Sequence, residues 1–329
     1  MLQLPRIAAL RPEGLESFGP EFLNFEGLPL RQVFFFAHFV LNNDWGPPMI
    51  NLQYQAPHDA LTPFVSSFYH FDYQGPPMRE LERADRAQFR VLLRGSGRYH
   101  FIDGTDCPTY PVTLLGPTTA PMQTSTDGSM IVFGWGMTPA GWSALMGNAA
   151  CDWVDKAFDA RDIFGDTLVE LQQQLLDAPD IDAQFAIGQA AAAEIFAMSD
   201  TAAFEFTSIV DHWLLDGTEH PIEALATATG LSARHVERLT KRYYGMPPKK
   251  LARKYRAVRA AHILAVGDSL NDTELGLSFY DQSHLIREIK QFTGLTPSEL
   301  KAGSSELTAA TMRERGKLGD TVSPLVSES

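Results

Sequence analysis

The chain has 329 residues, of which 44% are hydrophobic and 20% charged, and its 27 Lys and Arg against 40 Asp and Glu give a net charge of −13. This length predicts two domains, and two cysteines cannot build a disulfide framework or a four-ligand zinc site, which favours a reducing cytoplasm. Met1–Pro12 lacks the pattern of a secretory signal, which argues against such a signal. The longest apolar run, Val33–Leu41, is too short to span a bilayer, so the membrane class is excluded.

The first part of the sequence predicts a β-rich domain over residues 1–160. Short segments rich in Phe, Val and Tyr follow one another between residues 30 and 137, separated by Gly, Pro and Asn clusters. Many short strands without intervening helices indicate an antiparallel barrel or sandwich. The candidate strands are Gln32–Val40, Met49–Gln55, Val65–Phe71, Phe89–Arg94, Arg98–Ile102 and Met130–Trp135.

Two helices are expected next, in a linking segment over residues 161–200. Asp166–Leu176 and Ile181–Met198 contain no proline and place apolar residues at helical spacing. Such a helical hairpin would suit the interface of a homodimer, and core packing within one subunit explains it equally well. At the carboxy-terminal end, residues 304–329 are rich in Ser, Thr and Glu and lack apolar periodicity, so we expect a disordered tail there.

The charge is unevenly distributed along the chain. Residues 1–200 carry the whole net charge of −13, whereas residues 201–303 carry +1. Within the second region, Arg234–Arg259 holds ten basic residues against a single acid, Glu237. This local excess is typical of a surface that binds phosphate, although a solvated helix face is an equally good explanation of a charge run alone.

Two segments of residues 204–303 match each other at a fixed offset of 49 residues. Five matches of residue type at one offset, within about fourteen positions, indicate a repeated supersecondary unit. The matching pairs are His235 with His284, Arg238 with Arg287, Lys241 with Lys290, Gly245 with Gly294, and Pro248 with Pro297.

The first unit, expected over residues 222–244, has the signals of a helix–turn–helix motif. Gly230 supplies a sharp turn after the first helix, Ser232 caps the second helix, and Gly245 ends it. The second helix is then free to enter a major groove. Its inward face is expected to consist of Val236, Leu239 and Tyr243.

The second unit, expected over residues 271–293, repeats this plan with Asp281 as the N-cap. Leu285, Ile289 and Phe292 are expected to be buried. Between the units, Pro248 to about Val266 predicts a stiff helix of about 27 Å. A spacer of that length could hold two recognition helices near one DNA turn, about 34 Å, apart.

Residues 204–303 resemble the AraC/XylS-type DNA-binding domain. The resemblance implies an all-α domain in which tandem helix–turn–helix units are joined by a long helix, and most members of the family are transcription factors. The residues that carry it are Leu225, Ala226, Gly230–His235, Arg238 and Lys241 in the first unit, and Phe279–His284, Arg287 and Lys290–Pro297 in the second.

By matching position, the resemblance implies which side chains meet double-stranded DNA. Three departures weaken parts of this resemblance. Thr240 stands where the family usually has Phe, and Thr273, Glu274 and Ser278 stand where it usually has an apolar-Ala pair and a turn glycine. Gly276 lies inside a helix, where glycine costs about 1 kcal/mol relative to Ala, so the second unit is expected to be less stable than the first. The residues expected to face bases are Ala233, Arg234, Glu237 and Arg238 in one major groove and Ser283, His284 and Arg287 in the next. Those expected to contact phosphate are Lys241, Arg242, Gln282 and Lys290.

The amino-terminal half resembles the cupin-like sensor domain often found beside this DNA-binding domain, through its strand pattern and the segments Arg94–Tyr99 and Leu115–Thr118. A barrel interior lined by aromatic side chains would be a pocket for a small-molecule effector, although core packing is the simpler role of each aromatic residue. Arg90, Arg94 and Arg98 offer an anchor for an anionic effector, and a solvated strand face explains them more simply. The aromatic residues are Phe34, Phe35, Phe36, Phe39, Trp45, Phe68, Tyr69, Phe71, Tyr73, Trp135 and Trp142.

Neither a metal nor another cofactor is expected, and no enzymatic activity. His38, His58, His70 and His100 stand singly, without the close spacing of metal ligands on adjacent strands. The sequence also has no Gly-x-Ser-x-Gly or Walker A motif.

The sequence therefore predicts an α+β multidomain protein, with an antiparallel cupin-like β-barrel and helices followed by an all-α tandem helix–turn–helix domain. The leading hypothesis is a cytoplasmic, sequence-specific transcription regulator that binds DNA as a homodimer under small-molecule control, without a membrane partner. The alternative is a metal-independent cupin-like enzyme or ligand carrier whose helical module binds DNA weakly. In a third interpretation, the second unit contacts RNA polymerase instead of bases.

Overall fold

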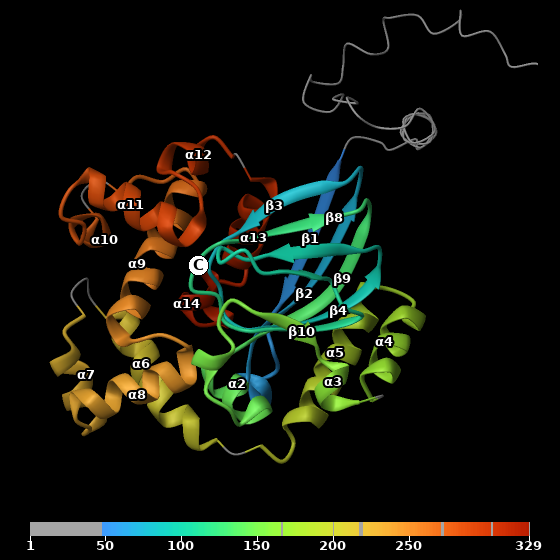
Figure 1. Ribbon diagram of the computed structural model, residues 1–329, viewed down its shortest axis with the longest axis horizontal. Coiled ribbons are helices and arrows are strands. Elements are labelled where there is room, and N and C mark those ends of the chain that lie inside the picture. The colour runs from blue at the N-terminus through green and yellow to red at the C-terminus, as the bar shows by residue number, and fades with distance from the viewer. Residues whose placement is uncertain are drawn as a thin grey trace, which may run out of the picture. The chain divides into compact units, whose positions relative to one another are not determined.

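A computed structural model describes residues 48–329, apart from 166, 200, 217–219, 271–272, 304 and 329. Within these residues an antiparallel β-region comes first and helices follow it (Figure 1). The predicted strand Gln32–Val40, together with Phe34, Phe35, Phe36, His38, Phe39 and Trp45, lies outside the described residues.

The described strands form two antiparallel sheets. The larger sheet has the order β1-β2-β9-β4-β7-β10 and the smaller one the order β3-β8-β5-β6. In the larger sheet the strands are β1 (Met49–Gln55), β2 (Val65–Gln74), β9 (Met130–Met137), β4 (Gln88–Arg94), β7 (Val112–Leu115) and β10 (Ala157–Asp159). In the smaller sheet they are β3 (Met78–Glu82), β8 (Met122–Thr126), β5 (Gly97–His100) and β6 (Asp106–Pro108).

The expected antiparallel β-domain is confirmed, in the form of two sheets. Five predicted strands correspond to β1, β2, β4, β5 and β9, and β1 has the predicted bounds. Sequence reasoning missed β3, β6, β7, β8 and β10, which have three to five residues each. Such short segments carry too few residues for alternation to be recognised.

Side chains of the larger sheet alternate between two environments, as the pleat requires. On one face Phe68, Phe89 and Trp135 pack in the main core, where the rings of Phe89 and Trp135 stack with centroids 4.1 Å apart. Tyr69 and Phe71, from the same strand as Phe68, belong to a separate cluster on the other face. The sheet therefore has a core side and a second side that lines a cavity.

Helices cover the core side of the larger sheet (Figure 1). The two predicted helices of the linking segment are present as α4 (Thr167–Asp177) and α5 (Ile181–Phe196). They pack in the main core with α2 (Pro139–Met146), while the short α3 (Arg161–Phe164) precedes α4. Because their apolar faces are used in this core, packing within the subunit accounts for the helical periodicity of the segment.

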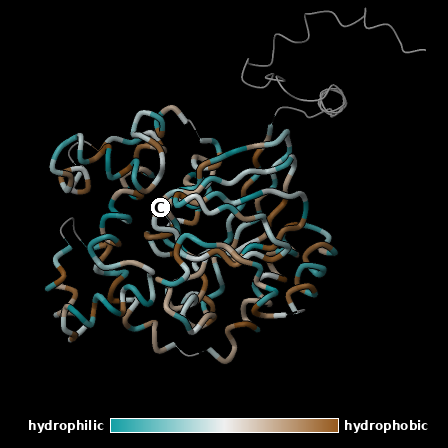
Figure 2. Tube along the Cα trace, in the orientation of Figure 1, coloured by the Kyte–Doolittle hydropathy of each residue, from teal (hydrophilic) through white to brown (hydrophobic). Residues whose placement is uncertain are grey.

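The carboxy-terminal region is helical, as predicted. Hydrophilic and hydrophobic residues alternate in short stretches along its helices (Figure 2), which is typical of helices with one buried face. Their bounds are α6 (Ala202–Leu215), α7 (Ile222–Thr229), α8 (Ala233–Tyr244), α9 (Pro248–Ala265), α10 (Glu274–Leu277), α11 (Gln282–Thr293) and α12 (Pro297–Lys301).

The expectation of a disordered tail over residues 304–329 is wrong for the described part of that segment. It contains α13 (Glu306–Gly316) and α14 (Pro324–Ser327), and α13 lies beside β1 and β3 (Figure 1). The physical reason is that a few apolar side chains suffice to fix it, since Met312 and Leu325 are completely buried. The polar composition of the segment gave no sign that these two side chains are buried.

Replacing Met312 with alanine tests the packing of the tail. We expect Met312→Ala to lower the free energy of unfolding by about 2–5 kcal/mol, because it opens a cavity in a closed cluster. Urea unfolding measures this, with Arg313→Gln as the control, since that neighbouring side chain is 62% exposed. Equal stability of the two variants would contradict the packed tail.

Candidate nucleic-acid interface

Helix α8 is the second helix of the first helix–turn–helix unit. The hydroxyl group of Ser232 accepts a hydrogen bond from the amide of His235, and the chain turns at Gly245 with a φ of 78°. The buried face consists of Val236, Thr240 and Tyr244. The predicted Leu239 and Tyr243 are only partly buried beside this cluster, so the inward face is rotated from the one expected.

Thr240 is buried, and its hydroxyl group forms a hydrogen bond within the helix. The side chain is completely buried, and its hydroxyl group donates to the carbonyl of Val236 at 2.8 Å. This internal hydrogen bond removes the cost of an unpaired polar group in the core. The position therefore holds a threonine without an orphaned donor.

The outward face of α8 carries most of the side chains assigned to DNA. Ala233, Arg234, Arg238, Lys241 and Arg242 are exposed. Glu237 is partly exposed and forms an ion pair with Lys241 at 2.8 Å, and Arg238 contacts the ring nitrogen Nε2 of His235 at 2.7 Å. The helix thus presents arginine side chains to solvent along one side.

Helix α11 repeats the arrangement in the second unit. The carboxylate of Asp281 accepts from the amide of His284 at 2.7 Å, and Gly294 has a φ of 77°. Ile289 and Phe292 are buried as predicted, whereas Leu285 is only partly buried. Gln282, Ser283, Arg287 and Lys290 are exposed.

His284, a predicted base-facing residue, is held by its neighbours in the fold. Its ring nitrogen Nδ1 accepts from the amide of Tyr280 at 3.2 Å, and the ring meets Phe279 edge-on. Beside it, Leu277 and Tyr280 are 78% and 92% exposed. Sequence reasoning assigned neither of the two a role in binding, although exposed apolar side chains often mark an interaction site.

Helix α10, before the second turn, is a single turn long. It begins after Thr273, whose hydroxyl group accepts from the amide of Gly276. A Cβ atom on Gly276 would lie 2.1 Å from the carbonyl oxygen of Leu270. The glycine that departs from the family pattern is thus required by a close approach of the backbone.

Glu288, on the buried side of α11, links this helix to α9. Its side chain is 2% exposed and forms ion pairs with Arg253 at 2.6 Å and Arg256 at 2.9 Å. Burial alone would raise the pKa of Glu288, but Arg256 and Arg253 together hold that pKa below its usual value. The three charges fix α11 on α9.

The basic run is consequently not a single solvated face. Arg253 and Arg256 form ion pairs with Glu288, and Arg259 forms an ion pair with Glu328 of the tail at 2.9 Å. Lys254 is buried, and its ammonium group donates to the carbonyls of Asp85 at 2.6 Å and Thr118 at 2.9 Å. The basic residues from Arg234 to Lys249 are exposed, whereas those from Arg253 onward contact other parts of the protein.

The β-region contacts the carboxyl ends of both recognition helices. A Cβ atom on Gly245 would lie 2.4 Å from Val154, and one on Gly294 would lie 3.1 Å from Leu81. The amide of Ala84 also donates to the carbonyl of Phe292, in the last turn of α11, at 2.7 Å. Both helices are therefore seated on the β-region by the ends that follow their exposed arginines.

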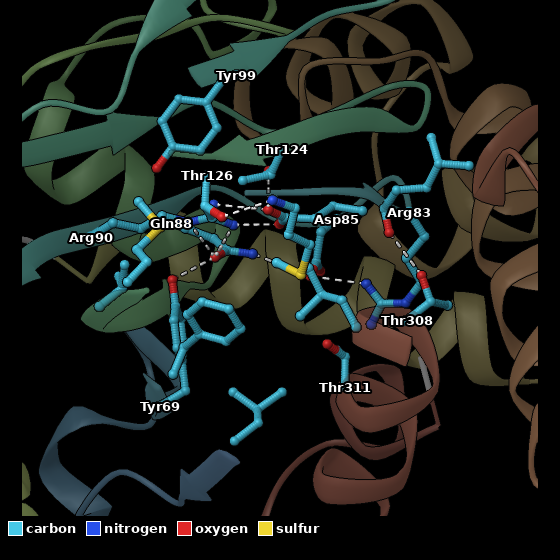
Figure 3. A pocket seen from close by; sticks show the side chains of 18 of the residues that line it. Tyr69, Arg83, Asp85, Gln88, Arg90, Tyr99, Thr124, Thr126, Thr308 and Thr311 are labelled. Atoms are coloured by element: carbon cyan, nitrogen blue, oxygen red, sulfur yellow. Dashed lines mark hydrogen bonds and ion pairs between the residues drawn. The ribbon is translucent and has the colours of Figure 1, made fainter. Parts of the chain in front are cut away.

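A cavity lies between the two sheets and helix α13. Tyr69 and Tyr99 turn their hydroxyl groups toward the same space from opposite sides (Figure 3). Arg90 lines it, whereas Arg94 is exposed and Arg98 pairs with Asp106 at the surface. Of the three arginines considered as effector anchors, the fold brings only Arg90 to the cavity.

Two further searches concern ligands and membranes. Within the described ranges, no group of three or more His, Cys, Asp or Glu side chains could hold a metal ion. In the same part of the chain, no helix is long and apolar enough to cross a membrane.

Comparisons with known proteins place the helical region in a family. Residues 225–303 match a family model described as a helix-turn-helix domain. Over 86 residues the chain is 34% identical to the bifunctional transcriptional activator/DNA repair enzyme Ada of Escherichia coli, covering 26% of this chain and 24% of Ada. Over 92 residues it is 33% identical to the putative HTH-type transcriptional regulator YkgA of the same organism, covering 27% of this chain and 38% of YkgA.

The match thus spans a quarter to two fifths of the length of these curated relatives. Among solved structures, ToxT from Vibrio cholerae O395 aligns with 78% of this chain and 97% of its own, at 9% identity and a TM-score of 0.42.

The Glu288 contact can be tested by removing the carboxylate. We expect Glu288→Ala to lower the free energy of unfolding by about 3 kcal/mol at pH 7, because Arg256 keeps its charge in a largely buried place. Since the folded state lowers the pKa of Glu288, this advantage of the natural chain should shrink as the pH falls below 4.5.

Chemical denaturation at several pH values measures both effects. Glu237→Ala is the matched control, because its ion pair with Lys241 is about half exposed, and we expect no measurable change. A loss for Glu288→Ala that stays constant down to acidic pH would contradict the assigned charge interaction.

Proposed function

We propose that this chain, whose residues 225–303 form an AraC-type helix–turn–helix domain, is a transcription regulator that recognises specific DNA sequences. The observation that carries the proposal is the repeated placement of an exposed arginine, Arg238 on α8 and Arg287 on α11. In both units the helix is capped at the same point before the arginine and ends at a glycine after it.

The two recognition helices would enter successive major grooves of double-stranded DNA. Helix α9 has 18 residues and therefore spans about 27 Å, near the rise of one DNA turn. Base edges would be met by Ala233, Arg234, Glu237 and Arg238 on α8, and by Ser283, His284 and Arg287 on α11. Phosphate would be met by Lys241, Arg242, Gln282 and Lys290.

Some of these side chains must exchange partners on binding. Lys241 would leave Glu237 for a phosphate, and Arg238 would leave His235 for a base. Both contacts are exposed, so water and salt already weaken them and the exchange costs little. Gln282 and Lys290, at either end of α11, would fix the position of the second unit.

The β-region would supply control by a small-molecule effector, bound in the cavity between the sheets. We further propose that the protein acts in the cytoplasm, where it would meet DNA as a homodimer. A second role is favoured by one observation: Leu277 and Tyr280, exposed beside the second recognition helix, form an apolar spot that would suit a protein partner such as RNA polymerase.

Substitutions on α8 separate base recognition from phosphate binding. Arg238→Ala should cost about 1–3 kcal/mol on the preferred duplex and little on a scrambled one, because a bidentate contact to guanine is lost. Lys241→Ala should weaken both duplexes alike and flatten the dependence on salt. Titrations of both duplexes at several salt concentrations measure this, and equal losses for Arg238→Ala on the two duplexes would remove its base role.

Footprint length distinguishes the roles of the second unit. If α11 recognises bases, the full chain should protect two successive major grooves, and Arg287→Ala should shorten the protection to one. A single protected groove in the natural chain, with Leu277→Ala impairing transcription but not DNA binding, would instead favour the protein contact.

A further inference from the structure

The tail that follows the second unit contacts three hydrophobic clusters. Residues 305–328 lie beyond the matched helix-turn-helix domain. Leu307 and Ala310 belong to the cluster on the second side of the larger sheet. Met312 belongs to the core of the second unit, and Leu325 to the core of the first. One short segment is therefore packed against the β-region and against both units.

Polar contacts hold both ends of α13 on the β-region. Ser305, the N-cap of α13, donates from its hydroxyl group to the carboxylate of Glu80 on β3 at 2.5 Å. Arg315, in the last turn, forms an ion pair with Asp85 at 2.7 Å, and its side chain is 6% exposed. Hydrogen bonds to charged groups are roughly twice as strong as neutral ones. In Figure 1, α13 accordingly lies beside β1 and β3.

The end of the tail is held by the helical region instead. Leu325 of α14 is completely buried in the core of the first unit, where α14 lies against α6. Glu328 forms an ion pair with Arg259 of α9 at 2.9 Å. Residues 317–323 join α13 to α14. Because this connection is short, the helical region cannot move far from the β-region while both helices of the tail stay in place.

The β-region places an acidic group at the end of α8 that would meet the DNA backbone. Its short helix η4 (Ala150–Asp152) packs against α8, and a Cβ atom on Gly245, which ends α8, would lie 3.4 Å from the carbonyl oxygen of Ala150. Asp152 is exposed there, whereas Lys241 and Arg242, assigned to phosphate, lie in the last turn of α8. A carboxylate at this end opposes an approaching phosphate, because salt screens charges closer than about 8 Å only in part.

We propose that residues 305–328 act as a strap, which holds the β-region against the ends of both recognition helices and thereby restrains DNA binding. This inference rests on the proposed function. When α13 leaves β3, the helical region is free to move away from Asp152, while Glu288 keeps α11 in place on α9. Since coupling between two equilibria is reciprocal, DNA must loosen the strap by the same factor by which the strap weakens DNA binding.

A substitution on α13 loosens the strap in the full chain. Leu307→Ala removes apolar contact with the cluster of the β-region and leaves the cores of both units unchanged. We expect the variant to bind its preferred duplex at least about fivefold more tightly, within the usual range of coupling between sites. Fluorescence anisotropy titrations measure this. Unchanged or weaker binding by the folded variant overturns the proposal.

Thr321→Ala is the matched control, because it shortens an exposed side chain of the same tail without changing the charge. We expect this variant to bind DNA as the natural chain does. A gain equal to that of Leu307→Ala would assign the effect to the tail in general and overturn the role of the contact with the β-region.

Hydrogen exchange tests the strap in the natural chain, and it decides even if Leu307→Ala does not fold. The amides of α13 should exchange at least about fivefold faster when the preferred duplex is bound. The amide of Ala84, which donates to Phe292 of α11, should do the same. Peptides from β9, whose side chains lie in the main core, serve as the internal control. Equal or slower exchange of α13 on DNA overturns the strap.

The strap and the proposed function can fail separately. A chain that selects a DNA sequence, but whose affinity Leu307→Ala leaves unchanged, contradicts the strap alone. A chain that prefers no sequence over a scrambled duplex contradicts the proposed function. In that case the holding role of the tail is still measured without DNA, because Leu307→Ala should speed the exchange of the Ala84 amide, and unchanged exchange there overturns it.

Discussion

Asp85 holds together three parts of the described chain that are distant in sequence. Its side chain binds Arg83 beside it and Arg315 of the tail, and its backbone carbonyl binds Lys254 of the long helix α9. All of these groups are largely or wholly buried, and a buried charge is tolerated only with a partner. Burial lowers the pKa of Lys254 to about 7, because desolvation disfavours the charged ammonium group. The hydrogen bonds of this group offset part of that cost.

Buried charges and packing also fix the positions of α8 and α11. Glu288 fixes α11 on α9 through Arg253 and Arg256, while α8 is held through its apolar face and its seat on the β-region. The spacing between the two exposed arginine faces is therefore set by packed elements, not by a flexible linker. A small rearrangement at the base of α9 or α11 would change both the spacing and the tilt of the helices.

The sequence predicted what depends on local signals. Helix caps at Ser232 and Asp281 and the turn glycines Gly230, Gly245 and Gly294 are all present, because each involves residues close together in the chain. The 49-residue repeat was likewise sufficient to predict two helix–turn–helix units. The arginines that the resemblance assigned to DNA, Arg234, Arg238 and Arg287, are exposed.

The predictions that were wrong concern residues whose partners are distant in sequence. The tail was expected to be disordered because Met312 and Leu325 are buried only by packing against other elements, which the sequence of the tail does not show. Lys254 falls on the apolar side of α9, between Leu251 and Tyr255, and that position was an available sign that it is buried. The close seating of Gly245 and Gly294 on the β-region has a consequence for domain exchange: a foreign β-domain placed before these helices would need matching grooves for two helix ends and acceptors for one lysine.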